Sequence, residues 1–340
     1  MTNNAGITNL RATGHGLRGL LASEHYQELP LGPLDPNRVE AVWRYESPQP
    51  CSQLVLPDGR MDLVAHATRA ADGALQAVWL AIAGPADGWS RVPMRAGMLS
   101  VGVRFHIGWG GVCLGLSPAA MRNQVVVGAP VLACLGPLAQ GMLNARTPVA
   151  LQQALIDAVL ALLARAKPGA AHARALRAIG QVMAGAGPGI GTDSGGGGGG
   201  GGGSDAPASA DGPHSAGASA RALRRDVQAA VGLSLRSLSG VLRFQRAVAL
   251  LNARAASSLA DLASSAGYAD QAHMTREFRR FGGFTPALPQ PVPVLGAAPT
   301  GWPNPSIPPH GPWPYSMASN EPPCHAHSAP FCDARPNGLP

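Results

Sequence analysis

The sequence predicts an α+β protein of several domains, with a β-rich domain first and an all-α domain after it. Residues 25–127 alternate between apolar and polar positions and are interrupted by short turns containing Gly and Asp, which is typical of antiparallel strands. Residues 195–203 are nine consecutive glycines, a run that cannot bury apolar surface. The segment that follows the glycines has helical periodicity and contains many arginines, which indicates packed helices with a basic face.

The charge of the chain is compatible with a nucleic-acid partner. The 340 residues include 26 basic and 19 acidic side chains, for a net charge of +7, and every basic residue except Lys167 is an arginine. Arginine forms forked hydrogen bonds to phosphate and to guanine, although a GC-rich genome produces the same preference. The charge therefore permits DNA or RNA as a partner without indicating either.

The first domain is predicted at residues 25–145, where stretches such as LVLPDGRMDLV and MLSVGVRFHIG combine period-two alternation with tight turns. Leu151–Ala166 then carries leucines and a valine at helical spacing, and the pattern continues more loosely through residues 172–182. We expect residues 146–185 to form a pair of amphipathic helices that closes the first domain.

The remaining segments are predicted to lack a packed core. Residues 1–24 and the proline-rich residues 287–340 are expected to be disordered, and residues 186–218 are expected to form a glycine-rich linker. The uncharged stretch at residues 124–143 is interrupted by Pro130 and Pro137, so we predict no membrane span there. The N-terminus lacks the pattern of a secretory signal, and the five cysteines are scattered, so we expect a cytoplasmic protein without a disulfide framework.

Residues 257–286 have the pattern of a helix-turn-helix. Ser258 can cap a short helix, Gly267 lies just past its end, and Asp270 can cap a second helix. The second helix would bury Met274 and two phenylalanines and would expose a face rich in arginine. A short capped helix, a turn containing Gly and a basic helix are typical of DNA-binding units. An ordinary helical hairpin with a solvated arginine face fits the spacing equally well.

At these residues the sequence is similar to a known family. The stretch GYADQAHMTREFRRFGGFTP resembles the second helix-turn-helix of the AraC-type transcriptional regulators, and GLSLRSLSGVLRFQRAVALL resembles the long helix that joins their two units. The resemblance covers residues 219–286. It implies a sequence-specific DNA-binding transcriptional regulator that inserts one recognition helix of each unit into successive major grooves. Double-stranded DNA is the implied partner, and RNA polymerase is a candidate partner.

In the second unit the resemblance identifies residues 271–281 as the recognition helix. The side chains implied to face bases are Gln271, Ala272, Thr275 and Arg276. A pairing of Gln271 with adenine or of Arg276 with guanine contributes about 1–3 kcal/mol of discrimination. Arg279 and Arg280, one turn further on, are expected to hold phosphates. For His273, packing or capping within the turn is favoured over a base contact, and both stay open.

The first unit is predicted to be incomplete. Residues 220–231 match the start of the family's first recognition helix, in which a Ser-x-Arg-x-Leu-x-Arg pattern begins at Ser219. The resemblance implies that this helix presents Arg221, Arg224 and Arg225 to DNA. The scaffold helix that precedes it in the family is missing, because the sequence there is SDAPASADGPHSAG, with two prolines and no apolar stripe. Either that helix is degraded or the glycine-rich insertion displaces it.

The first domain also resembles a known type. LVLPDGRMDLV and GVRFHIGWGGVCLGLSPAAMRNQVV are similar to an uncharacterised small β-rich domain that often stands in front of AraC-type helix-turn-helix regions. Its position implies a domain that senses a small-molecule effector of unknown identity, forms a homodimer, or does both.

No motif of a catalytic nucleophile or a metalloprotease occurs in the sequence, so we predict no enzyme and no cofactor. The clustered polar candidates of the first domain are Asp58, Asp62, His66, Arg104 and His106. Asp58 fits a tight turn and Arg104 fits a structural bridge to Asp62, so no metal site is predicted. Cys113 and Cys134 lie in apolar surroundings and are expected to be buried rather than reactive.

Other interpretations stay open. Metal-ligand residue types occur close together near the C-terminus, at Cys324, His325, His327 and Cys332, but an incidental cluster is favoured there. The alternative function is a small-molecule-binding or enzymatic front domain with a vestigial DNA-binding end, which the incomplete first unit and the glycine run favour. A nonspecific, architectural DNA-binding protein is a third alternative.

Overall fold

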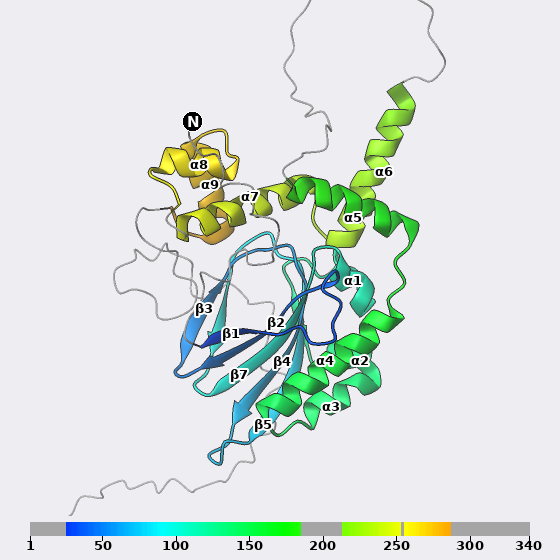
Figure 1. Ribbon diagram of the computed structural model, residues 1–340, viewed down its shortest axis with the longest axis vertical. Helices are drawn as coiled ribbons and strands as arrows, with labels where there is room; N and C mark the ends of the chain where they lie inside the picture. Colours follow the sequence, from blue (N-terminus) through cyan, green and yellow to red (C-terminus); the bar gives the residue numbers. More distant parts are fainter. Residues whose placement is uncertain (1–24, 185–212, 253–254, 287–340) are drawn as a thin grey trace, which may run out of the picture. The chain divides into compact units, whose positions relative to one another are not determined.

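The computed structural model describes residues 25–184, 213–252 and 255–286 (Figure 1). The segments predicted as disordered, residues 1–24 and 287–340, lie outside the described residues, as does most of the predicted linker. The cluster of Cys324, His325, His327 and Cys332 lies outside them too. Within the described residues, the predicted order of a β-rich region followed by a helical region is confirmed.

The β-rich part is built on a six-stranded antiparallel sheet with the strand order β1-β2-β7-β4-β5-β8. Its strands are β1 (Tyr26–Leu29), β2 (Val39–Ser47), β4 (Asp62–Arg69), β5 (Leu75–Ala83), β7 (Met98–Phe105) and β8 (Val125–Val127). A second sheet pairs β3 (Cys51–Val55) with β6 (Ser90–Met94). The alternation in the sequence therefore corresponds to strands whose side chains point in turn to the two faces of the sheet.

Helices cover one face of the large sheet (Figure 1). They are α1 (Trp109–Leu114), α2 (Ala129–Leu135), α3 (Ala139–Leu143) and α4 (Pro148–Arg165), with the 3-10 turn η2 (Gly136–Leu138) between α2 and α3. Helix α4 begins at Pro148 because Thr147 caps it, accepting a hydrogen bond from the backbone N–H of Ala150 at 3.2 Å. Its Leu151, Leu155 and Leu162 are fully buried in the core shared with the sheet. We call β1–β8 with α1–α4 the front domain.

One described helix, α4, is long and apolar enough to cross a membrane. Its apolar stripe packs into the core of the front domain, as expected for a core helix of a globular domain. The uncharged stretch at residues 124–143 folds into β8, α2, η2 and α3, with breaks near Pro130 and Pro137.

The second helix of the predicted closing pair, α5 (Ala170–Met183), has a different neighbour. It packs along α6 (Pro213–Val231), which comes after the glycine run (Figure 1). Helix α6 begins at Pro213, within the predicted linker and earlier than the expected residue 220. Proline favours the first position of a helix, because its ring fixes φ at a helical value and the N–H that it lacks would have no partner there.

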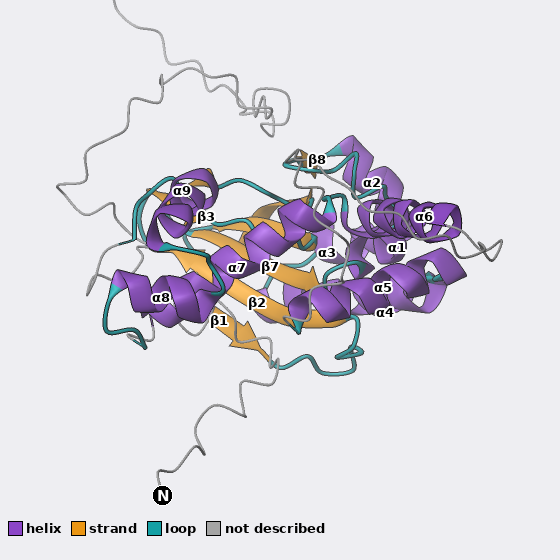
Figure 2. Cartoon of the chain, turned by 90° about the horizontal axis from the view of Figure 1, so that it is seen from above, coloured by secondary structure: helices purple, strands orange, loops and turns teal. Residues whose placement is uncertain are grey.

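Three further helices complete the described chain. They are α7 (Leu235–Asn252), α8 (Leu259–Ala266) and α9 (Gln271–Gly282), which lie together in Figure 2. They form one core with Leu54 and Leu56 of the front domain, and Phe244 of α7 is fully buried in it against residues of α8 and α9.

Candidate nucleic-acid interface

The turn between α8 and α9 forms as the sequence predicts. The hydroxyl of Ser258 accepts a hydrogen bond from the backbone N–H of Asp261 at 3.1 Å, which caps α8. Gly267 ends α8 in the left-handed region, with φ of 88°. The Asp270 carboxylate accepts a hydrogen bond from the N–H of His273 at 2.6 Å and caps α9. These two caps fix where each helix begins, and we call α8, the turn and α9 the second unit.

One side of α9 is anchored in the core of the second unit. Met274, Phe278 and Phe281 are fully buried. The ring of Phe244 from α7 meets Phe278 nearly edge-on, with ring centroids 5.0 Å apart, and lies 5.7 Å from the ring of Phe281. Aromatic pairs in this geometry add to the free energy gained from burial. The buried side therefore fixes which face of α9 points outward.

The outward face of α9 carries the residues that the family resemblance implies. Among them, Gln271, Ala272, Arg276, Arg279 and Arg280 are exposed. Thr275 is partly buried, and its hydroxyl donates a hydrogen bond to the carbonyl of Gln271 at 2.9 Å. Arg280 lies over the ring of Phe281, at 4.8 Å from the ring centre. This face is therefore polar, basic and open to solvent.

His273 lies in a network that ties α9 to its surroundings. Its ring meets Tyr268 edge-on at 5.3 Å, and its Nε2 lies 3.7 Å from a carboxylate oxygen of Glu277. Arg243 of α7 donates a hydrogen bond to the same carboxylate at 3.2 Å and lies over the Tyr268 ring. Burial raises the pKa of Tyr268. Of the two roles left open for His273, this arrangement favours packing.

The first recognition helix, α6, has exposed arginines and a buried side. Arg221, Arg224 and Arg225 are exposed. On the inner side, Val227 and Val231 form one cluster with Ile179 and two alanines of α5. Arg174 of α5 also donates a hydrogen bond to Asp226 of α6 at 2.9 Å.

Helix α5 thus supplies a neighbouring helix for α6 from the far side of the glycine run. The sequence predicts α5 as part of the helix pair that closes the front domain, because apolar residues at helical spacing do not indicate which neighbour they will pack against. Contacts with the front domain exist as well, since His172 of α5 meets the ring of Trp109 edge-on at 5.1 Å. We call α6 together with α5 the first unit.

Paired acids leave a net positive surface on the two recognition helices. Glu277 of α9 is paired with Arg243, and Asp226 of α6 is paired with Arg174. Both partner arginines belong to other helices. These two acids therefore do not neutralise the arginines on the outward faces of α6 and α9. Such a surface attracts the phosphate backbone of DNA.

The polar cluster of the front domain is structural. The predicted bridge is confirmed: Arg104 donates two parallel hydrogen bonds to the Asp62 carboxylate, at 2.8 and 2.9 Å, from the adjacent strand. Trp43 donates a third hydrogen bond to Asp62 at 3.1 Å. Arg104 also pairs with Asp58 at 3.2 Å, and Asp58 accepts from the N–H of Arg60 within the turn between β3 and β4.

The two histidines of the cluster have other partners. Nδ1 of His66 lies 2.8 Å from the hydroxyl of Ser100, and its ring stacks on Trp79. Burial lowers the pKa of His66 to about 4. His106 contacts the carbonyl of Pro36 at 3.0 Å. Across the described residues, no three His, Cys, Asp or Glu side chains gather in a way that could hold a metal ion.

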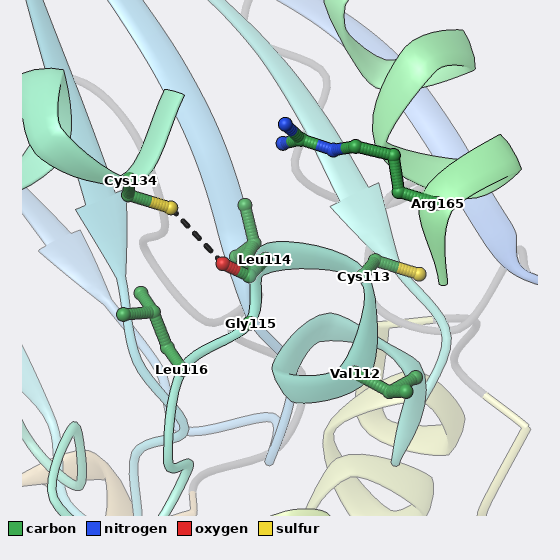
Figure 3. A pocket seen from close by; sticks show the side chains of 7 residues that line it. All are labelled: Val112, Cys113, Leu114, Gly115, Leu116, Cys134 and Arg165. Carbon is green, nitrogen blue, oxygen red and sulfur yellow. Dashed lines mark hydrogen bonds between the residues drawn. The ribbon is translucent and has the colours of Figure 1, made fainter. Parts of the chain in front are cut away.

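An open cavity of about 350 Å³ lies beside α1 in the front domain. Its lining residues are Val112, Cys113, Leu114, Gly115, Leu116, Cys134 and Arg165 (Figure 3). Burial raises the pKa of Cys113 to about 11 and also raises that of Cys134, whose thiol donates to the carbonyl of Leu114 at 3.0 Å. Both thiols therefore stay protonated at neutral pH and are poor nucleophiles.

The geometry of the helical region agrees with the comparison with known families. The family described as helix-turn-helix domain matches residues 214–288. Residues 214–288 are therefore similar to the helix-turn-helix domain of AraC-type regulators. This domain makes the protein a DNA-binding transcriptional regulator. Its residues 29–127 match a second family, described as a domain of unknown function (DUF6597).

Solved structures of ToxT from Vibrio cholerae are similar to this chain at low identity. One is 10% identical, covers 77% of this chain and 96% of its own, and has a TM-score of 0.31. Another, ToxT bound to (E)-4-(8-methylnaphthalen-1-yl)but-3-enoic acid, is 9% identical, covers 77% and 97% of the two chains, and has a TM-score of 0.31. A likeness this distant carries no argument about the site. No match to the regulator is found among curated proteins.

Proposed function

We propose that this regulator reads a two-part DNA site, with α9 of the second unit in one major groove and α6 of the first unit in the next. The observation that carries the proposal is the division of α9 into a fully buried apolar side and an exposed face with Gln271, Arg276 and Arg279. A helix held this way presents its polar face as a rigid surface of about the right width for a major groove.

The residues of α9 divide into two roles. Gln271 and Arg276 lie toward its N-terminal half and would contact base edges, where bidentate pairs discriminate between bases. Arg279 and Arg280 lie in the last turn and would contact phosphates, which adds affinity without sequence information. In the first unit, Arg221, Arg224 and Arg225 would serve α6 in the same way, because α5 braces the buried side of that helix.

The decisive experiment starts from genomic fragments selected with the purified full-length chain. We expect a motif of two parts, spaced by about one helical turn of DNA. A duplex with both parts is called the two-part duplex below, and a duplex with only the part read by α9 is called the single-site duplex. Enrichment of one part alone would contradict a role for α6, and equal affinity for random DNA would indicate an architectural DNA-binding protein.

Arginine variants then separate base reading from phosphate binding. Arg276→Ala is expected to weaken binding to the single-site duplex by about 1–3 kcal/mol and to affect random DNA much less. Arg279→Ala is expected to weaken both equally and to make the log-log salt slope shallower by about 0.9. The control is Arg91→Ala, an exposed arginine on β6. Unchanged binding by a folded Arg276→Ala protein would contradict the proposal and favour a vestigial DNA-binding end.

For the front domain we propose a non-enzymatic role in the cytoplasm, in which it binds a small-molecule effector, forms a homodimer, or does both, and thereby biases DNA binding or contact with RNA polymerase. The mutual pairing of Asp62 and Arg104 supports a structural rather than a catalytic role for these two groups. Sedimentation of the chain with and without the two-part duplex tests the dimer. A monomer on DNA at all concentrations would exclude it.

A further inference from the structure

Helix α7 is bound to the front domain by a buried polar contact at its middle. Gln245 is 9% exposed, and its Nε2 donates a 2.8 Å hydrogen bond to the carbonyl of Pro57 in the turn between β3 and β4. Its Oε1 accepts from Arg60 at 3.4 Å, and Arg60 is paired with the buried Glu40. Both ends of the Gln245 amide are therefore satisfied by the front domain, and either group would be costly to leave buried without a partner.

The turn between β3 and β4 is itself fixed to the large sheet. Asp58, next to Pro57, pairs with Arg104 of β7, and Arg104 is held by Asp62 of β4. A continuous chain of hydrogen bonds and ion pairs thus leads from the sheet to the middle of α7.

A second polar contact lies near the start of α7. Ser237 donates a hydrogen bond to the carboxylate of Asp87 at 3.0 Å. Asp87 is 8% exposed and also receives hydrogen bonds from Arg122 and, at 2.9 Å, from Asn123. Burial alone would raise the pKa of Asp87, but the donors from Arg122, Asn123 and Ser237 outweigh it and hold the pKa below its usual value. The start of α7 is thus held to a preorganised charged group of the front domain.

The front domain also packs against the ends of both recognition helices. At Gly232, which follows α6, a Cβ would lie 2.4 Å from the carbonyl oxygen of Pro118. At Gly283, which follows α9, a Cβ would lie 2.6 Å from the ring of Trp89. Both glycines have positive φ, 79° and 73°, so no other residue fits either place without strain. Both ends are in contact with front-domain atoms at a distance that only glycine permits.

These contacts leave the proposed DNA-reading faces of α6 and α9 uncovered. All arginines proposed to contact DNA are exposed: Arg221, Arg224, Arg225, Arg276, Arg279 and Arg280. A front domain that regulated binding by masking would have to cover some of them. Instead it holds the connecting helix and the ends of the two recognition helices.

We infer that the front domain controls DNA binding by setting the position of the two units relative to each other, through α7, and that Gln245 is the positioning residue. This inference rests on the proposed function of α6 and α9. A two-part site requires both helices at a fixed spacing, whereas a single site requires only one of them. Loosening α7 should therefore weaken binding to the two-part duplex and spare the single-site duplex.

The test is Gln245→Leu in the full-length chain, which keeps the size of the side chain and removes both of its polar contacts. We expect affinity for the two-part duplex to fall about tenfold, as for the loss of roughly one to two buried hydrogen bonds, with affinity for the single-site duplex unchanged. The matched control is Gln153→Leu on the exposed side of α4, which should change neither. Higher affinity for both duplexes would indicate masking and overturn the inference, as would unchanged affinity for both.

A milder variant keeps the test decisive if Gln245→Leu fails to fold, as judged by circular dichroism. Ser237→Ala removes one hydrogen bond to Asp87 and is expected to weaken only the two-part duplex, by about threefold to tenfold. An equal effect on both duplexes would overturn the inference. Failure of the proposed function gives a different result. In that case Arg276→Ala binds the single-site duplex with wild-type affinity, whatever the effect of Gln245→Leu.

Discussion

Removal of the Ile179 side chain tests whether α5 supports the first recognition helix. Ile179 is 3% exposed and lies in one cluster with Val227 and Val231 of α6. Ile179→Ala deletes three carbon atoms, worth about 2.4 kcal/mol at about 0.8 kcal/mol per buried carbon. The cavity left behind adds to this, so the expected loss of unfolding free energy is about 2–5 kcal/mol.

The loss should affect α5 more than the rest of the chain. Helix α5 has 14 residues, and its N-cap, Gly169, provides no side-chain hydrogen bond. A helix of that length is marginal by itself in water, so it depends on its packing against α6 and the front domain. If α5 loosens, α6 loses part of its buried side, and we expect the orientation of Arg221 and Arg225 to be less fixed.

The assay combines urea unfolding with binding to the two duplexes. Ile179→Val should cost about 0.5–1.5 kcal/mol of unfolding free energy, and Ile179→Ala should cost more. Affinity for the two-part duplex should fall in the same order, while the single-site duplex stays bound. Met183→Ala, at a 40% exposed position of the same helix, should change stability by less than about 0.5 kcal/mol. If Ile179→Ala destabilises the protein and the two-part duplex is still bound as in wild type, α5 does not position α6.

Two further predictions concern the front domain. His66 has a pKa lowered by burial to about 4, so the folded state keeps it neutral while the unfolded chain takes up a proton below about pH 6.5. Stability should therefore decrease as the pH falls from about 6.5 to about 4, by at most about 1.4 kcal/mol per pH unit; an equal slope in His66→Gln would contradict this. Arg104→Leu leaves the Asp62 carboxylate without its main partner and should cost about 2–4 kcal/mol, which Asp62→Leu in the same chain should largely restore. Chemical denaturation measures both, and an Arg104→Leu cost as small as that of the exposed Arg91→Leu would refute the structural role.

Much of the site could be predicted because its signals are local. Ser258, Gly267 and Asp270 cap and end helices through contacts within three or four residues of themselves, and the spacing of Met274, Phe278 and Phe281 defines a buried side. The ion pair between Arg104 and Asp62 could also be predicted, because opposite charges on two predicted antiparallel strands can face each other across the pair. Gln245 was missed, since a polar residue in a helix gives no local sign that it will be buried.

The amino-acid sequence alone determined the strands, the capped helices, the basic face of α9 and the resemblance to AraC-type regulators, because each depends on neighbours along the chain or on a short motif. Tertiary structure alone decided which helix covers α6 and how α7 meets the front domain. The ion pair between α5 and α6 joins residues 52 positions apart, and the hydrogen bond from Gln245 to Pro57 joins residues 188 apart. Apolar periodicity predicts that one face of a helix will be buried. Which element covers that face depends on the shape and polar groups of a surface that exists only after the chain has folded.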